Sequence, residues 1–324
     1  MFSRKLATPV GGIVLCLMMT VCGNRACGQD PITLSGNPLQ GVIDFHVHSG
    51  PDSFSRSITD FEIARIARDR GMGALVLKNH FTMTADRAVL AERLTGMKCF
   101  GGVVLNRAVG GLNAEAIRRM VTFSGSRGKV VWLPTFDAEN HVKHFGENRP
   151  FVRVVQQGQP VPELKTIFQL VAEHDLVLAT GHSSAAECLL LIRAAAAAGV
   201  TKMLVTHAMA DPIAMNTDQL QQVAQLGAKI ECVWLTNLSG PKSHLPNMRH
   251  WRRVTTRDYI AAFRTVGTQH FVLASDLGQY LNPIHTDGLT AFILELQAAG
   301  ITDTQIDQLA RQNAAALLGM AQSN

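Results

Sequence analysis

The chain has 324 residues, of which 47% are hydrophobic and 17% charged, and its formal net charge is +5. This amount of apolar material suffices for one large core. Because the positive charge is modest and no long Lys/Arg run occurs, we expect a small-molecule partner and no nucleic acid.

The N-terminal residues differ in composition from the rest of the chain. Arg4 and Lys5 precede an apolar run from Val10 to Val21, and the small residues Ala26 to Gly28 follow it. This pattern is typical of a cleaved secretory signal, and the run is too short to anchor the protein stably in a membrane. We therefore predict a signal peptide at 1–28, an extension at 29–40 and the main domain at 41–324. The predicted location is secreted or periplasmic rather than cytoplasmic, and a frayed extension is the alternative.

After about residue 40, short apolar runs alternate with helical patterns. The helical segments Phe61–Arg70, Ser184–Ala198 and Thr217–Leu226 each end at a glycine, which is a common helix stop, and Thr59 or Asp60 could cap the first of them. The predicted strands are Val42–His48, Ala74–Asn79, Phe100–Leu105, Lys129–Phe136, Leu176–His182, Met203–His207, Lys229–Leu235 and Phe271–Asp276. Eight apolar strands alternating with helices predict an α/β fold, a single-domain (β/α)8 TIM barrel. A doubly wound open sheet is the alternative, but no glycine-rich loop follows the first strand.

Two connections are longer than a barrel requires. They run from Asp137 to Pro162 after strand four and from Thr236 to Arg257 after strand seven, and the first contains a candidate hairpin near 151–159. Both follow the carboxyl ends of strands, where barrel enzymes assemble their active sites, so we expect them to cover the site. Cys99, Cys188 and Cys232 lie in apolar stretches and are expected to be core residues with at most one disulfide.

Polar residues gather at the predicted strand ends. Strand one reads Val-Ile-Asp-Phe-His-Val-His, and strict alternation would put Asp44, His46 and His48 on the inner face and Ile43, Phe45 and Val47 against the helices. His182, His207 and Asp276 end strands five, six and eight. Any one histidine could be structural, but imidazoles and a carboxylate converging on one barrel mouth predict a divalent metal site. Zinc suits these ligands best, and iron, manganese and nickel are alternatives.

These residues resemble the metal ligands of the amidohydrolase superfamily, and Arg311–Met320 is similar to the helix that closes many members. The resemblance implies that His46, His48 and Asp276 hold one metal. His182 and His207 would hold a second metal, or one of them would ligate while the other, as His207 could, assists catalysis. Asp276 would also act as general base for the attacking water.

The sequence departs from the superfamily pattern at strand four. Binuclear members usually bridge their metals with a carboxylated lysine or a glutamate there, and Val130–Asp137 contains neither. Lys78, after strand two, could carry the bridging carbamate or could be a plain ammonium group, and Asp137 is a further candidate. The sequence therefore leaves open whether each chain binds one metal ion or two.

Other polar residues near the strand ends are candidates for positioning or substrate contact. Asp44 could orient a ligand histidine or could simply be buried. The expected substrate contacts are Asn79, His80, Asn106, Arg107, His141, His144, Arg149, Arg153, Lys242, His244, Arg249 and His250. Their basic character suggests an anionic substrate. The sequence leaves open whether the protein forms a homo-oligomer.

The resemblance implies hydrolysis of an amide, cyclic amide, ester or lactone by a metal-activated water. A mononuclear decarboxylase of an unsaturated or aromatic acid is the nearest alternative, because such relatives also lack the strand-four ligand. A phosphoesterase like the polymerase and histidinol phosphatases would have seven strands. A non-catalytic metal- or solute-binding barrel is the third alternative.

Overall fold

The computed structural model describes residues 36–320. The predicted signal peptide and most of the predicted extension lie outside the described residues. Among residues 36–320, no helix combines the length and apolar character needed to cross a bilayer.

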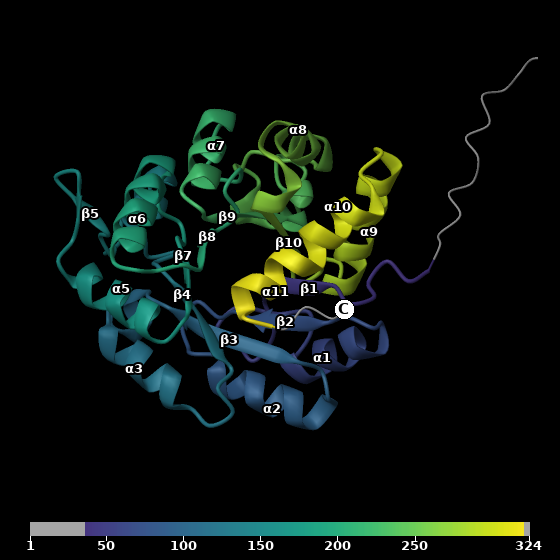
Figure 1. Cartoon of the computed structure of the whole chain (residues 1–324), viewed down its shortest axis with the longest axis horizontal. Coiled ribbons are helices and arrows are strands. Elements are labelled where there is room, and N and C mark those ends of the chain that lie inside the picture. The colour runs from purple at the N-terminus through teal and green to yellow at the C-terminus, as the bar shows by residue number, and fades with distance from the viewer. Residues whose placement is uncertain (1–35, 321–324) are drawn as a thin grey trace, which may run out of the picture. The chain divides into compact units, whose positions relative to one another are not determined.

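Eight parallel strands form the barrel, in the order β1-β2-β3-β4-β7-β8-β9-β10 (Figure 1). Their bounds are β1 Ile43–Val47, β2 Ala74–Leu77, β3 Cys99–Val104, β4 Gly128–Trp132, β7 Val177–Ala179, β8 Met203–Val205, β9 Lys229–Val233 and β10 Phe271–Ala274. The first and last strands meet beyond the end of β10, where the N–H of His48 donates to the carbonyl of Leu277 at 3.0 Å. The predicted barrel is thus confirmed. The phosphoesterase alternative predicted seven strands, and the barrel has eight.

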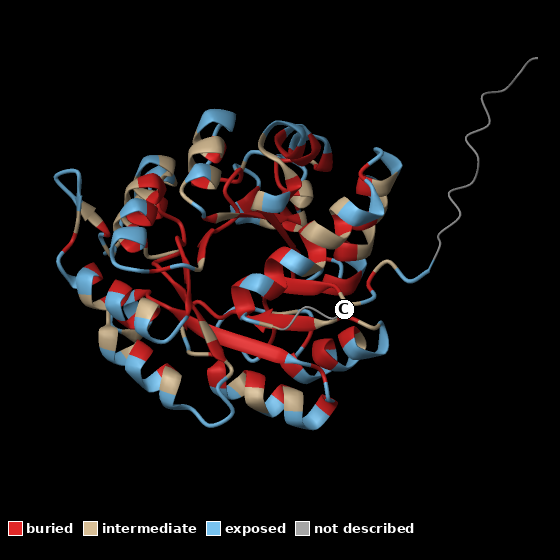
Figure 2. Cartoon of the chain, viewed as in Figure 1, coloured by how far each residue is buried: buried red, intermediate tan, exposed pale blue. Residues whose placement is uncertain are grey.

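Helices surround the strands, and their outer faces are exposed while the strands are buried (Figure 2). They are α1 Asp60–Asp69, α2 Ala85–Thr95, α3 Ala114–Thr122, α4 Glu139–His144, α5 Glu163–Glu173, α6 Ala185–Ala197, α7 Thr217–Gln225, α8 Thr256–Val266, α9 His285–Ala298, α10 Asp303–Asp307 and α11 Asn313–Leu318. The start of α1 is fixed as predicted, because Thr59 and Glu62 form a reciprocal capping box.

The apolar core has two layers. One lies between the strands and the surrounding helices. The other draws residues from all eight strands and, among the helices, only from α11, so it fills the barrel interior. The Asn313 side chain at the start of α11 donates to the carbonyl of Phe271 at 2.7 Å, where β10 begins. Helix α11 therefore closes the amino end of the barrel, and the polar residues lie at the other end.

Strand β1 does not alternate strictly, and that prediction was wrong. Asp44 pairs with Leu75 and Val47 with Leu77, so three steps along β1 match two along β2. Because of this bulge, the side chains that follow it point to the opposite face from the one that strict alternation predicts. Ile43 and Phe45 belong to the barrel interior rather than to the helix contact, whereas Val47 packs towards the helices.

The first long loop contains α4 and a small hairpin, β5 Val155–Gln156 with β6 Gln159–Pro160, which confirms the predicted hairpin. The second long loop contains only short 3-10 turns, at Trp234–Leu238 and Pro246–Met248. Cys99, Cys188 and Cys232 are buried free thiols, as expected for core residues.

Candidate metal centre

Three predicted ligands converge where β1 and β10 end. Nε2 of His46 and Nε2 of His48 lie 3.2 Å apart, and Oδ1 of Asp276 lies 3.1 Å from the first and 3.2 Å from the second. His46, His48 and Asp276 are all buried. Within residues 36–320 they form the one group of three or more potential ligands that is compact enough to hold an ion.

The contacts of His48 indicate which of its two ring nitrogens is free to bind a metal. Nδ1 of His48 lies 3.1 Å from the carbonyl oxygen of Lys78, which can only accept, and 3.4 Å from the guanidinium of Arg56, which can only donate. The shorter contact favours the proton on Nδ1, which leaves Nε2 with a lone pair. Burial lowers the pKa of both imidazoles well below their usual range, so they are neutral. Nε2 of His48 therefore faces two acceptors, the Nε2 of His46 and the carboxylate of Asp276.

A divalent cation between these atoms would satisfy all three acceptors, whereas a proton could serve only one. Burial raises the pKa of Asp276 to about 8, with a further contribution from the charge of Glu231 and against the opposing effect of Lys78. The three residues thus fit a metal by the chemistry of their donor atoms.

Glu231 on β9 is the functional residue that the sequence reasoning missed. Its Oε2 atom lies 3.2 Å from Nδ1 of His46 and accepts the backbone N–H of His207 at 2.8 Å. A carboxylate behind a ligand imidazole fixes the ring and raises its basicity. The detectable signal was a charged residue within the otherwise apolar Ile230–Val233, because carboxylates are rarely buried without a role.

His182 and His207 form a second pair beside the first. Their Nε2 atoms lie 3.2 Å apart, and the rings of His46 and His207 stack with centroids 6.2 Å apart. Nδ1 of His182 lies 2.8 Å from Nδ1 of His141, which α4 brings from the first long loop. His80 stacks on His48 with centroids 4.8 Å apart. The structure therefore brings six histidines to one end of the barrel.

Lys78, directly after β2, reaches into the same space. Its Nζ lies 3.0 Å from Nε2 of His46, and the side chain is buried. Burial lowers the pKa of this amine to about 8, against the opposing effect of Asp276 and Glu231. Lys78 is thus within reach of the predicted metal, as a bridging carbamate requires.

The backbone at this end of the barrel requires unusual conformations. Asp276 has φ 53° and His207 has φ 26°, in the left-handed region that costs a non-glycine residue of order 1–3 kcal/mol. Gly278 has φ 116°, and a Cβ there would lie 1.8 Å from the carbonyl oxygen of His48. The chain therefore adopts strained geometry where the ligands converge.

Several other predicted residues do not join the ligands. Asp137 is bound by Arg149 at 2.6 Å and by the backbone N–H of Arg107, so it cannot bridge metals in this arrangement. The side chain of Asn79 accepts from Phe81 and shapes the turn after β2. Asp44 contacts no ligand ring.

Asp44 instead acts on the backbone of the site. Its Oδ1 atom accepts the N–H groups of His46, at 3.2 Å, and of Ser275, at 2.9 Å. Burial raises the pKa of Asp44 to about 7. Arg56, which the sequence reasoning also missed, lies 3.4 Å from His48 and is paired with Asp52 at 2.6 Å.

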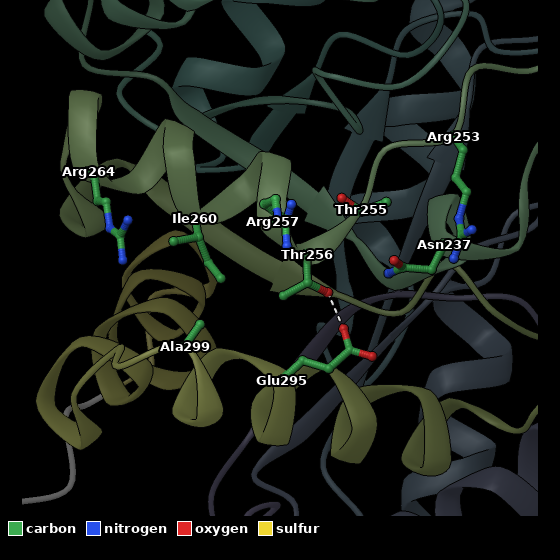
Figure 3. Close-up of a pocket in the computed structure, with 9 residues that line it drawn as sticks. All are labelled: Asn237, Arg253, Thr255, Thr256, Arg257, Ile260, Arg264, Glu295 and Ala299. Atoms are coloured by element: carbon green, nitrogen blue, oxygen red, sulfur yellow. Dashed lines mark hydrogen bonds between the residues drawn. The ribbon is translucent and has the colours of Figure 1, made fainter. Parts of the chain in front are cut away.

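A hollow of about 680 Å³ lies elsewhere, between α8 and α9 (Figure 3). Arg253, Arg257 and Arg264 line it together with Glu295, which accepts from the hydroxyl of Thr256. No histidine lines this hollow, so it is separate from the metal centre.

Residues 41–231 match a family of unknown function (DUF6282). The chain belongs to this family. A comparison with curated protein sequences finds no match.

Several solved structures with similar folds are named as hydrolases. A mutant organophosphorus hydrolase from Deinococcus radiodurans is 15% identical, with a TM-score of 0.56 over 88% of this chain and 95% of that one. An organophosphate hydrolase engineered from a weak promiscuous lactonase is 15% identical, with a TM-score of 0.58 over 88% and 98%. A probable 2-pyrone-4,6-dicarboxylic acid hydrolase from Acinetobacter baumannii is 15% identical, with a TM-score of 0.55 over 87% and 100%. At this identity they establish the fold alone, a (β/α)8 barrel.

Proposed function

We propose that this protein is a metal-dependent hydrolase that cleaves an amide, cyclic amide, ester or lactone. The observation that carries the proposal is the set of three acceptors, Nε2 of His46, Nε2 of His48 and Oδ1 of Asp276, within 3.2 Å of one another. They lie at the carboxyl end of a barrel, where barrel enzymes carry out their chemistry. The structural neighbours are named as hydrolases, which supports the reaction class.

The residues would divide the work as follows. His46 and His48 would hold the metal, and Glu231 would keep the ring of His46 in place through Nδ1. When bound, a divalent cation supplies Lewis acidity and lowers the pKa of water to about 7. Asp276 would take a proton from the attacking water and deliver it to the leaving group, with His207 assisting.

We propose zinc as the metal, because imidazole with carboxylate suits it. The second pair, His182 and His207, would allow a second ion. A carbamate on Lys78 could then bridge the two, because its Nζ already lies 3.0 Å from Nε2 of His46. From the signal-like composition of residues 1–28 we propose that the protein is exported, and we expect its substrate to be a small molecule.

The test combines metal analysis with hydrolysis of a panel of lactones, esters and amides. We expect one or two zinc ions per chain, and loss of both zinc and activity in the double variant His46→Ala, His48→Ala. His174→Ala, an exposed histidine at the end of α5, is the control and should change neither. Full metal and activity in the double variant would disprove the proposal.

A decarboxylase is the second candidate, and one observation favours it. Asp137, in the loop after β4, is held by Arg149 at 2.6 Å and is not available as a bridging ligand. Release of CO2 from an unsaturated or aromatic acid, with no hydrolysis of the panel, would favour this reaction. A mass increase of one CO2 on Lys78, with two zinc ions, would favour the binuclear hydrolase.

A further inference from the structure

Five aromatic side chains lie over the histidines, and we call them the aromatic cover: Phe54, Phe81, Phe136, Phe145 and Trp251. They follow β1, β2, β4 and β9, the same ends of the strands that carry the ligands. The site histidines are almost fully buried, while Phe54, at the outer edge, is 46% exposed. A molecule that reaches the ligands from this end of the barrel must therefore touch the cover.

Phe136 is the central ring of the cover. Its centroid lies 4.3 Å from that of His80, 5.2 Å from that of His141 and 5.6 Å from that of His182. The contacts with His141 and His182 are edge-on, at 84° and 81°, the arrangement that aromatic pairs prefer. Phe54 packs against Phe136 from the outer side, with centroids 5.7 Å apart.

Trp251 and Phe145 form the other side of the cover. Their rings stack at 5.5 Å and 15°, and Trp251 lies 6.5 Å from the ring of His207. Phe145 lies 4.7 Å from the ring of His141, which also contacts Phe136. The two sides of the cover thus meet at His141.

Three cations of the first long loop are already paired with carboxylates. Arg149 binds Asp137 and Glu147, both at 2.6 Å. Arg153 and Lys143 both bind Glu139, at 2.6 and 2.7 Å. A substrate carboxylate that lay against this loop would have to break these pairs or lie desolvated among the rings, and both are unfavourable.

We infer that the metal centre selects an uncharged substrate with an aromatic ring beside the bond that is cleaved. This inference rests on the proposed hydrolase function and differs from the anionic substrate that the loop composition suggested. An aromatic ring of the substrate can pack edge-on or offset against the rings of the cover. A saturated ring of similar size gains only from the burial of its apolar surface.

Three methyl esters with the same leaving group test the inference on the zinc-loaded protein. They are methyl phenylacetate, methyl cyclohexylacetate and methyl (4-carboxyphenyl)acetate. We expect kcat/KM for the phenyl ester to exceed that for the cyclohexyl ester by about threefold to tenfold. The carboxylate ester should be at least about tenfold poorer than the phenyl ester.

Two variants test the cover itself. Phe136→Leu removes the ring but keeps an apolar side chain, and the phenyl preference should fall below about twofold. If Phe136→Leu disturbs zinc binding, Trp251→Leu provides an independent test. It should also reduce the preference for the phenyl ester. Phe123→Leu is the control, because Phe123 is 40% exposed and lies at the end of α3. Equal rates for the first two esters, or a preference unchanged in both variants, would overturn the inference.

Calorimetric binding of phenylacetamide and cyclohexylacetamide separates this inference from the proposed function. A protein that loads zinc and prefers phenylacetamide but hydrolyses nothing would disprove the hydrolase while supporting the aromatic cover. A protein that hydrolyses the esters and binds both amides equally would keep the hydrolase and disprove the cover.

Discussion

Oε2 of Glu231 contacts two histidine residues of the metal centre at once, Nδ1 of His46 at 3.2 Å and the backbone N–H of His207 at 2.8 Å. This one oxygen therefore connects the pair His46 and His48, which β1 delivers, to the second pair through His207, which follows β8. Burial raises the pKa of Glu231, which makes its charge costly in the absence of a cation.

Glu231→Gln should weaken zinc binding by about tenfold to a hundredfold. The amide can still accept both hydrogen bonds, but it lacks the charge that strengthens His46 as a ligand. Competition with a chromophoric chelator measures the affinity. Glu173→Gln, on the exposed end of α5, is the control, and an affinity as high as that of the parent protein would show that Glu231 is only structural.

Removal of zinc should destabilise the folded protein. At a free zinc concentration about 100 times the dissociation constant, binding contributes about 2.7 kcal/mol to the free energy of unfolding. Urea unfolding with zinc and with EDTA measures this difference. The difference should vanish in the double variant His46→Ala, His48→Ala, and a difference that persists there would place the ion elsewhere.

Acid should destabilise the metal-free protein. Burial lowers the pKa of His141 and His207 to about 3 and of His285 to about 4. It also lowers the pKa values of His46, His48, His80 and His182 well below the usual range. An unfolded histidine titrates near pH 6.5, so below that pH the unfolded chain takes up these seven protons first.

Three carboxyl groups oppose this trend. Burial raises the pKa of Asp44 to about 7, of Asp276 to about 8 and also that of Glu231, so the folded state binds their protons first. Seven histidines outweigh three carboxyl groups, and the free energy of unfolding should fall by more than about 2 kcal/mol between pH 7 and pH 5. Urea unfolding in EDTA at both pH values checks this. Equal stability at the two pH values would mean that the histidines are not buried as neutral groups.

Gly278→Ala should abolish zinc binding. Its Cβ would lie 1.8 Å from the carbonyl oxygen of His48, so β1 and the turn after β10 would have to separate. We expect a loss of about 3 kcal/mol or more in the free energy of unfolding. Gly300→Ala is the control, because its φ is 84° but nothing lies within 4 Å, and it should cost about 1–2 kcal/mol. Zinc content and urea unfolding of both variants test this, and a zinc-replete Gly278→Ala protein would contradict it.

Much of the fold could be predicted from the sequence, because buried parallel strands are apolar runs with polar residues at one end. All eight strands were found, but the predicted ends were too long. For example, His182 and His207 were assigned to strands, whereas β7 ends at Ala179 and β8 at Val205. His46 lies within β1, but the other candidate ligands lie beyond the hydrogen-bonded ladder, where the chain turns out of the sheet.

The remaining features depend on pairings that a single sequence does not show. Arg149 looks free in the sequence, but Asp137 and Glu147 of the same loop bind it. In the sequence, Glu231 is an isolated charged residue in an apolar strand, and only the fold shows that it lies beside His46. Phe136 looks like the last residue of an apolar strand, yet it covers the histidines.

The extra residue in β1 gives this strand two consecutive roles within five residues. On one side of it, Phe45 belongs to the apolar interior of the barrel, and on the other side His46 and His48 belong to the candidate metal centre. Deleting one residue between Asp44 and Val47 would exchange the inward and outward positions of everything on one side of the deletion. Among related chains, a length change at this point would therefore separate proteins that can hold a metal from barrels that only share the architecture.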